Sequence, residues 1–262
     1  MRVMSRIRKC VLGAVTAAAL CLTNVAARGD DGYRLLQIDG RNVKWGVAGP
    51  GTGASITYAV ATVLDGDAGI TNCRAVTGIG ALLEHSGLTA GAFGEALNSA
   101  LAMWEKAGNL HFVPTPSAAE AELLIGSETA ADGIAYADVT PVSSDTQGFS
   151  RIAKGVVCLN PQRRWVAGSS SAVSVTDRKS YDLAYVLAHE IGHVLGLDHP
   201  GPKGELMSFE YSGGIHALQA GDVAGIVALY GPSLDRGPAP VVARNGIPLK
   251  QLVLSARPSG SN

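Results

Sequence analysis

The sequence predicts an α+β domain in which a mixed, twisted β-sheet packs against helices. Segments rich in β-forming residues are interspersed with segments that have the apolar spacing of helices, and the two types do not alternate strictly. Of the 262 residues, 47% are hydrophobic and 16% are charged, so a buried core is expected. Glycine occurs 33 times, which indicates many turns.

Residues 1–27 have the layout of a secretory signal peptide. Four basic residues within the first nine precede the apolar run VLGAVTAAALCL, and small residues lead to a cleavage position after Ala27. The alternatives are a membrane anchor, for which the run is short and rich in Ala and Thr, and lipoprotein processing at Cys21. We therefore expect a secreted, periplasmic or extracellular protein with no membrane span.

Cleavage near Ala27 would change the charge and leave two cysteines. Residues 1–27 hold four of the 21 Lys and Arg residues and none of the 22 Asp and Glu residues, so the remainder has 17 − 22 = −5 net charges. This balance disfavours nucleic acid and anionic membranes as partners. Cys73 and Cys158 remain, and in an exported chain they most simply form one disulfide, with two buried free thiols as the alternative.

The predicted elements follow one another along a single domain. Residues 28–42 are expected to be an extended lead-in, residues 43–232 the folded domain and residues 233–262, with four prolines, a tail of little structure. The segments that alternate or cluster β-forming residues are 55–60, 110–115, 121–128, 133–139 and 155–160. The segments with helical spacing are 89–108, 180–196 and 217–231. Residues 61–86 and 140–154 are expected to be irregular.

The second predicted helix carries a candidate metal site in the stretch HEIGHVLGLDH. His189 and His193 are four residues apart, so a helix directs both imidazoles to one side. Nitrogen ligands in this arrangement suit zinc. Glu190 then lies beside the metal, where a carboxylate can accept a proton from a zinc-activated water.

A third ligand requires the helix to end. Gly196 can adopt a left-handed conformation and turn the chain, which would bring His199 back to the same metal. Three protein ligands leave one position open for water, as in catalytic zinc sites. The alternative is a helix whose histidines only pack or form hydrogen bonds. Five specified residues at fixed spacing arise by chance in a chain of this length on the order of 10⁻⁵ times, which favours the metal site.

This stretch resembles the signature H-E-x-x-H-x-x-G-x-x-H of the metzincin metallopeptidases. The resemblance implies a metzincin-like catalytic domain with an active-site helix and a C-terminal helix, and it makes Met207 the methionine of the turn beneath the metal. The order of KWG…ITYAV, ALAMWEKAGNLHFV, AELLIGS, GIAY and AGDVAGIVALYG is most similar to the matrixins, including their short bacterial relatives. Pro200-Gly201 is more similar to the serralysins.

The resemblance also has implications for substrate binding. It makes GIAYADV the edge strand above the cleft, to which an extended substrate pairs, and residues 208–214 the lining of the pocket beyond the cut bond. Phe209 and Tyr211 are the candidates that shape this pocket. Phe209 stands where serralysins and astacins carry a tyrosine that reaches the metal, and phenylalanine cannot be a ligand.

Other features of matrixins have no counterpart in the sequence. Residues 112–188 contain no histidine for a structural zinc, and residues 28–72 contain no cysteine for a zymogen switch. Calcium binding through Asp132, Asp138 or Asp145 is conceivable, with surface aspartates as the alternative. The isolated His85, His111 and His216 are interpreted as ordinary surface or core residues.

We therefore expect a monomeric, secreted zinc endopeptidase that binds one catalytic Zn²⁺ and acts on a protein or peptide. Glu190 is the expected base, and His189, His193 and His199 are the expected ligands. Two other hypotheses stay open. One is a secreted zinc-containing binding or adhesion module without turnover, and the other is a zinc hydrolase of cell-wall peptides.

Overall fold

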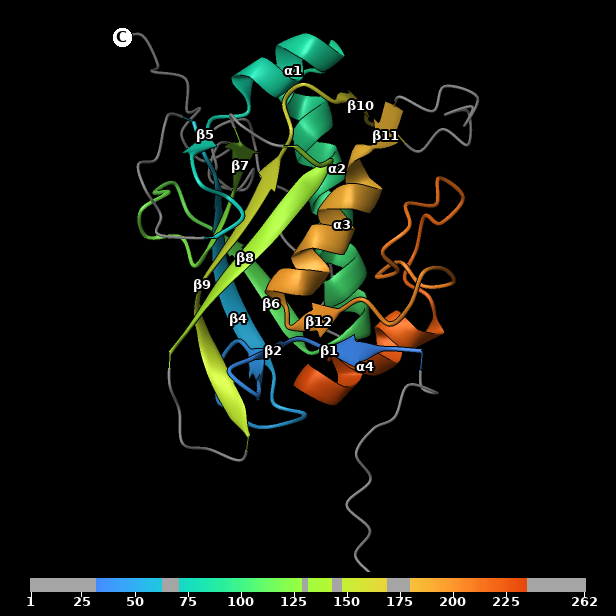
Figure 1. Cartoon of the computed structure of the whole chain (residues 1–262). Helices are drawn as coiled ribbons and strands as arrows, with labels where there is room; N and C mark the ends of the chain where they lie inside the picture. Colours follow the sequence, from blue (N-terminus) through green and yellow to red (C-terminus); the bar gives the residue numbers. More distant parts are fainter. Residues whose placement is uncertain (1–31, 63–70, 129–131, 143–147, 169–179, 235–262) are drawn as a thin grey trace, which may run out of the picture.

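The computed structural model describes residues 32–62, 71–128, 132–142, 148–168 and 180–234. The expected signal peptide and nearly all of the expected tail lie outside this part of the chain. Within it, helices pack against one face of an eight-stranded sheet (Figure 1), which confirms the predicted α+β class. No helix of the described residues is long and apolar enough to cross a membrane.

The main sheet is mixed. Its central path has the order β2 (Gln37–Ile38), β3 (Arg41–Lys44), β9 (Phe149–Leu159), β7 (Leu123–Glu128), β4 (Ala54–Val60) and β6 (Leu110–Pro114). All pairs along this path are parallel except β2 with β3. Two further strands, β5 (Val76–Thr77) on β7 and β8 (Ala135–Val142) on β9, are antiparallel to their partners. Strand β7 is buried along its whole length, including the polar residues Ser127 and Glu128 at its end.

Two long helices cover the inner face of the sheet. Helices α2 (Ala90–Ala107) and α3 (Leu183–Val194) lie side by side (Figure 1), and the indole Nε1–H of Trp104 donates a hydrogen bond of 2.9 Å to the Ala188 carbonyl between them. Thr89 caps α2 by accepting the N–H of Ala92 at 3.1 Å. Asp182 caps α3 in the same way. Helices α1 (Gly80–Ser86) and α4 (Ala220–Tyr230) complete the set among the described residues.

Several short strands were not predicted, because strands of two or three residues have no readable alternation. They form two small sheets, β1 (Arg34–Leu35) with β12 (Leu197–Asp198) and β10 (Arg164–Val166) with β11 (Ser180–Asp182). The predicted helix start at residue 180 is also wrong, since residues 180–182 form a strand and α3 begins at Leu183. The expected lead-in is extended, but it also supplies β1, β2 and the start of β3. The segment 61–86 was expected to be irregular and contains β5 and α1.

The predicted loop between the two strands at 133–139 and 155–160 is wrong in its extent. Strand β8 continues to Val142 and β9 begins at Phe149, with an irregularity between Thr140 and Pro141. A one-residue slip in pairing hides the alternation on which the strand prediction depends. The result is a long antiparallel hairpin whose outer strand, β8, pairs only with β9 among the described residues.

Candidate metal centre

Three histidine side chains converge near the C-terminal end of α3. His189 and His193 lie one turn apart on the helix, and His199 directly follows β12. The Nε2 atom of His199 lies 3.1 Å from that of His189 and 3.1 Å from that of His193. In the part of the chain that the structure describes, no other group of three or more His, Cys, Asp or Glu side chains brings its ligand atoms together in this way.

The spacing of these nitrogens fits a tetrahedral zinc ion. Two nitrogens that are each about 2.05 Å from such an ion lie about 3.3 Å apart, close to the observed 3.1 Å. Imidazole nitrogen is also a preferred donor for zinc, whereas calcium prefers oxygen. Three protein ligands leave the fourth tetrahedral position for water or substrate.

Backbone carbonyls orient two of the imidazoles. Nδ1 of His189 lies 2.8 Å from the Leu206 oxygen, and Nδ1 of His193 lies 2.9 Å from the Leu197 oxygen. Because a carbonyl oxygen only accepts, each Nδ1 must carry the proton and donate it. The neutral ring then has its lone pair on Nε2, which is the nitrogen that faces the other histidines.

Burial keeps the ligand set neutral. Desolvation lowers the pKa of His189 to about 4 and the pKa of His193 to about 3. Desolvation also lowers the pKa of His199, although the Asp198 carboxylate acts in the opposite direction. Metal ligands must be deprotonated, so these shifts prepare the site to bind a cation at neutral pH.

Glu190 is a buried carboxyl group with no partner among the residues that the structure describes. Only 8% of the residue is exposed, and its side chain makes no hydrogen bond or ion pair with the described residues. Burial raises the pKa of this carboxyl to about 8. A cation held by the adjacent histidines would favour the ionised form and lower this pKa again. Such a group is suited to exchange a proton with water at the metal.

Gly196 lies just beyond the C-terminal end of α3 and turns the chain. Its φ is +98°, a left-handed conformation, and its N–H donates to the His193 carbonyl at 2.9 Å. A side chain would also be excluded here, because a Cβ atom at Gly196 would collide with the carbonyl oxygen of Val43. The turn therefore both reverses the chain toward His199 and lets strand β3 approach the helix end.

The N-terminal strand β1 holds the segment that carries His199. Arg34 and Leu35 pair with Asp198 and Leu197, and the N–H of Leu36 donates to the Gly196 carbonyl at 2.8 Å. The Arg34 Nε atom lies 3.1 Å from the Asp198 carboxylate. This exposed ion pair is weak in itself, so the backbone pairing provides most of the constraint on this segment.

Met207 lies in a turn that is packed against α3. The residue is buried, and a Cβ atom at Gly192 would collide with its sulfur atom, so glycine allows the close contact. The Asp222 carboxylate at the start of α4 accepts the N–H groups of Leu206 at 2.8 Å and Met207 at 3.0 Å. Asp222 thus holds Leu206, whose carbonyl orients His189.

The two candidate pocket residues occupy different positions. Phe209 is 59% exposed, and its ring centroid lies 6.2 Å from that of His199, so it flanks the third histidine. Tyr211 packs edge-on against Tyr185 at 4.9 Å between ring centroids, and its hydroxyl accepts the N–H of Asp182 at 2.9 Å. Phe209 is therefore free to touch a ligand, whereas Tyr211 forms part of the supporting wall.

The aspartates considered for calcium gain no support from a cluster of ligands. The Asp138 carboxylate accepts hydrogen bonds from the N–H groups of Asn72 and Cys73. Asp132 is exposed and offers its backbone carbonyl to Arg163 at 3.1 Å, and Asp145 lies outside the described residues. Among the described residues, neither Asp132 nor Asp138 belongs to a group of side chains that could hold a metal ion.

Fold and site together define a metallopeptidase class. The sequence profile of the family described as Matrixin matches residues 82–231, which is more than half of the chain. The chain belongs to this family, as the sequence resemblance predicts.

Individual relatives match shorter parts. Matrix metalloproteinase-20 of Homo sapiens is 32% identical over 144 residues, which cover 53% of this chain and 28% of that protein. Interstitial collagenase of Oryctolagus cuniculus is 46% identical over 59 residues, 22% of this chain and 12% of that protein. Interstitial collagenase of Sus scrofa is 46% identical over 57 residues, 21% and 12% respectively. The chain therefore spans less than one third of the length of each of these relatives.

Sequence reasoning missed the residues that support the site. Asp222 follows Gln219 at the spacing of a capping box, a pattern that indicates a helix start but not the turn that the same carboxylate holds. The carbonyls of Leu197 and Leu206 are backbone groups, which no sequence pattern distinguishes. Arg34 reaches Asp198 across more than 160 residues of chain, and no local signal predicts that pairing.

Proposed function

We propose that this chain is a secreted zinc endopeptidase. The observation that carries the proposal is the convergence of three neutral imidazole nitrogens at the end of α3. Glu190, a buried carboxyl with no hydrogen-bond partner among the described residues, is adjacent to the first of them. Membership of the Matrixin family supports the same chemistry.

The residues around the site have different proposed roles in hydrolysis. When bound, zinc supplies a Lewis acid that polarises a peptide carbonyl and makes water more acidic. His189, His193 and His199 would hold the ion through the Nε2 atoms that face one another. Glu190 accepts a proton from the attacking water and passes it to the leaving nitrogen. Burial raises the pKa of this carboxyl and a cation bound beside it lowers the pKa again, so the two opposing effects suit a group that both accepts and returns a proton.

Strand β8 is the proposed docking edge for an extended substrate. It packs beside α3, and one of its edges pairs with β9 while no described strand pairs with the other. A peptide that adds to this free edge gains main-chain hydrogen bonds. Phe209, exposed beside His199, would contact a side chain of the bound peptide, with Tyr211 behind it.

Export is part of the proposal. Residues 1–27 have the composition of a signal peptide, and the structure joins Cys73 and Cys158 in a disulfide. Disulfides persist mainly in oxidising compartments. Recovery of the protein outside the cytoplasm with its N-terminus near residue 28 would support export, whereas an intact Met1 on the cytoplasmic protein would contradict it.

Hydrolysis of casein or gelatin by the purified, zinc-loaded protein tests the activity. We expect cleavage that a zinc chelator stops and that added zinc restores. Glu190→Ala should retain zinc in metal analysis and lose nearly all hydrolysis. Full activity of that variant would refute the role of Glu190, and a zinc-bound wild type that cleaves no peptide would favour a binding module.

A further inference from the structure

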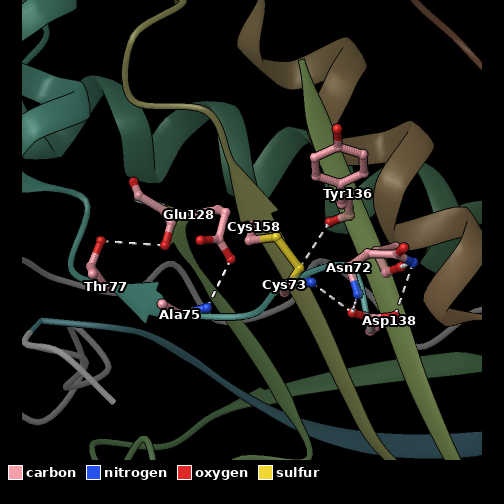
Figure 2. The surroundings of a disulfide bond; sticks show 10 residues. Asn72, Cys73, Ala75, Thr77, Glu128, Tyr136, Asp138 and Cys158 are labelled. Atoms are coloured by element: carbon pink, nitrogen blue, oxygen red, sulfur yellow. Dashed lines mark hydrogen bonds between the residues drawn. A yellow bond between two sulfur atoms is a disulfide. The ribbon is translucent and has the colours of Figure 1, made fainter. Parts of the chain in front are cut away.

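A strap of chain crosses the face of the sheet that the helices leave uncovered. Along β7 and β9, Leu123, Ile125 and Val157 face the helices, and the residues between them face the other way. A second apolar cluster gathers there, including Leu124, Val156 and Cys158 together with Cys73 and Val76. Figure 2 shows residues 72–77, which we call the strap, running over these strands.

The strap is fastened to the inner strands at two places. Val76 and Thr77 form β5 and pair with β7, and the N–H of Ala75 donates to the Glu128 carboxylate at 2.9 Å. The disulfide between Cys73 and Cys158 attaches the strap to β9 (Figure 2). Both cysteines are fully buried, so a reductant reaches this bond only when the fold opens.

The strap is also fastened to β8. The Asp138 carboxylate accepts the N–H of Asn72 at 2.7 Å, the N–H of Cys73 at 2.8 Å and the Asn72 side-chain amide at 3.0 Å. The Asn72 amide further donates to the Ala137 carbonyl at 3.3 Å. Asp138 thereby gives β8 a second attachment, in addition to its ladder with β9. The disulfide holds Cys73 where these bonds form.

None of the strap's contacts described above reaches the metal site. The groups that orient the histidines are Leu197, Leu206 and Asp222, which lie on the helical side of the sheet. Loss of the strap would therefore loosen β8 and leave the three imidazoles in place. Strand β8 also packs beside α3, but the strap's described contacts hold only the substrate edge and none of the groups that orient the histidines.

We propose that the disulfide-fastened strap positions β8 for substrate, so that efficient peptide hydrolysis requires the Cys73–Cys158 bond whereas zinc binding does not. This rests on the proposed function, in which β8 is the docking edge. Formation of the bond takes two protons and two electrons from the two thiols and transfers them to a disulfide oxidant such as oxidised glutathione. The chain thus becomes a competent peptidase only after it meets an oxidising compartment.

The test compares the wild type with the double variant Cys73→Ala/Cys158→Ala, both loaded with zinc. Chelator competition gives zinc affinity, a quenched-fluorescence peptide gives kcat and KM, and hydrogen exchange reports on β8. We expect the zinc affinity to stay within about twofold of the wild-type value. Because β8 would lose its charged hydrogen bonds to the strap, KM should rise roughly tenfold with a smaller change in kcat, and amide hydrogens of β8 should exchange faster. Unchanged kcat/KM, or an equal loss of zinc affinity, would overturn the proposal.

Asp138→Asn provides a second route if the double variant does not fold. It keeps the disulfide and weakens only the attachment to β8, so KM should rise by about threefold or more. Thr77→Val is the matched control, because Thr77 contacts Ser127 of β7 and not β8. Equal KM values for Asp138→Asn and Thr77→Val would reject the role of the strap. A wild type that cleaves no peptide would instead reject the proposed function.

Discussion

Replacement of Asp222 by asparagine tests how the metal site is supported from below. The carboxylate is 1% exposed and accepts three backbone N–H groups, from Leu206 at 2.8 Å, Met207 at 3.0 Å and Gln219 at 2.7 Å. Met207 donates to one carboxylate oxygen, and Leu206 and Gln219 donate to the other. Asparagine has the same size but only one accepting oxygen, so its NH₂ group must face at least one N–H.

The expected loss of stability follows from this mismatch between the asparagine amide and the backbone N–H groups. One buried donor left without a partner costs about 1–3 kcal/mol, and the remaining two bonds lose the strength that a charged acceptor gives them. The free energy of unfolding should fall by about 2–4 kcal/mol. Because Leu206 also orients His189, zinc affinity should fall about tenfold, the lower end of the range for groups that support a metal ligand.

Urea unfolding of the zinc-free protein and chelator competition measure these two effects. Glu205→Gln is the matched control. Glu205 accepts the N–H groups of Gly221 and Asp222 through a single oxygen, which the glutamine amide oxygen can replace, so we expect a change below about 1 kcal/mol. If Asp222→Asn and Glu205→Gln had the same stability and zinc affinity, Asp222 would not be the support described above.

Three further predictions concern pH, the helix end and the disulfide. In the zinc-free protein the pKa values of His189 and His193, about 4 and 3, lie below that of an unfolded histidine. As the pH falls, the histidines of the unfolded chain therefore bind protons before those of the folded chain, and the free energy of unfolding falls between about pH 6.5 and pH 4. It should fall more steeply than in a variant with both residues replaced by glutamine. Urea titrations that give both proteins the same dependence of stability on pH would contradict this. Gly196→Ala should lose about 3 kcal/mol and bind zinc weakly, because the new Cβ strains a left-handed turn and meets Val43, and an unaltered melting curve would show otherwise. Removal of the disulfide, which closes a separation of 85 residues, should lower the free energy of unfolding by about 2–4 kcal/mol, and a loss near zero would mean that the reduced chain keeps the same constraint.

The fold class and the convergence of the three histidines were predictable because they depend on local patterns. The spacing of His189, His193 and Gly196 on one helix is a local geometric property, and the helix at 89–108 differs from α2 by only one residue at each end. The same holds for the strands at 55–60 and 110–115, whose bounds agree with β4 and β6 to within one residue. Local periodicity identifies such elements because each buries one face.

The features that the sequence did not predict depend on contacts between residues that are far apart in the chain. Lys44 was given no role from sequence, yet it is fully buried, and its ammonium donates to the carbonyls of Trp45, Val47 and Thr52. Burial lowers the pKa of this ammonium to about 8. Strand β1 could not be predicted for a related reason, since two residues acquire a strand conformation only by pairing with β12. Tertiary context decides both cases.

Zinc K-edge X-ray absorption of the purified, zinc-loaded protein would identify the atoms that bind the metal. We predict one zinc per chain with three imidazole nitrogens at about 2.0–2.1 Å and one further light ligand. The His199→Gln variant should lose one imidazole from this shell. A zinc shell that contains sulfur, or one that keeps three imidazoles in the His199→Gln variant, would contradict the assignment of His189, His193 and His199 as the ligands.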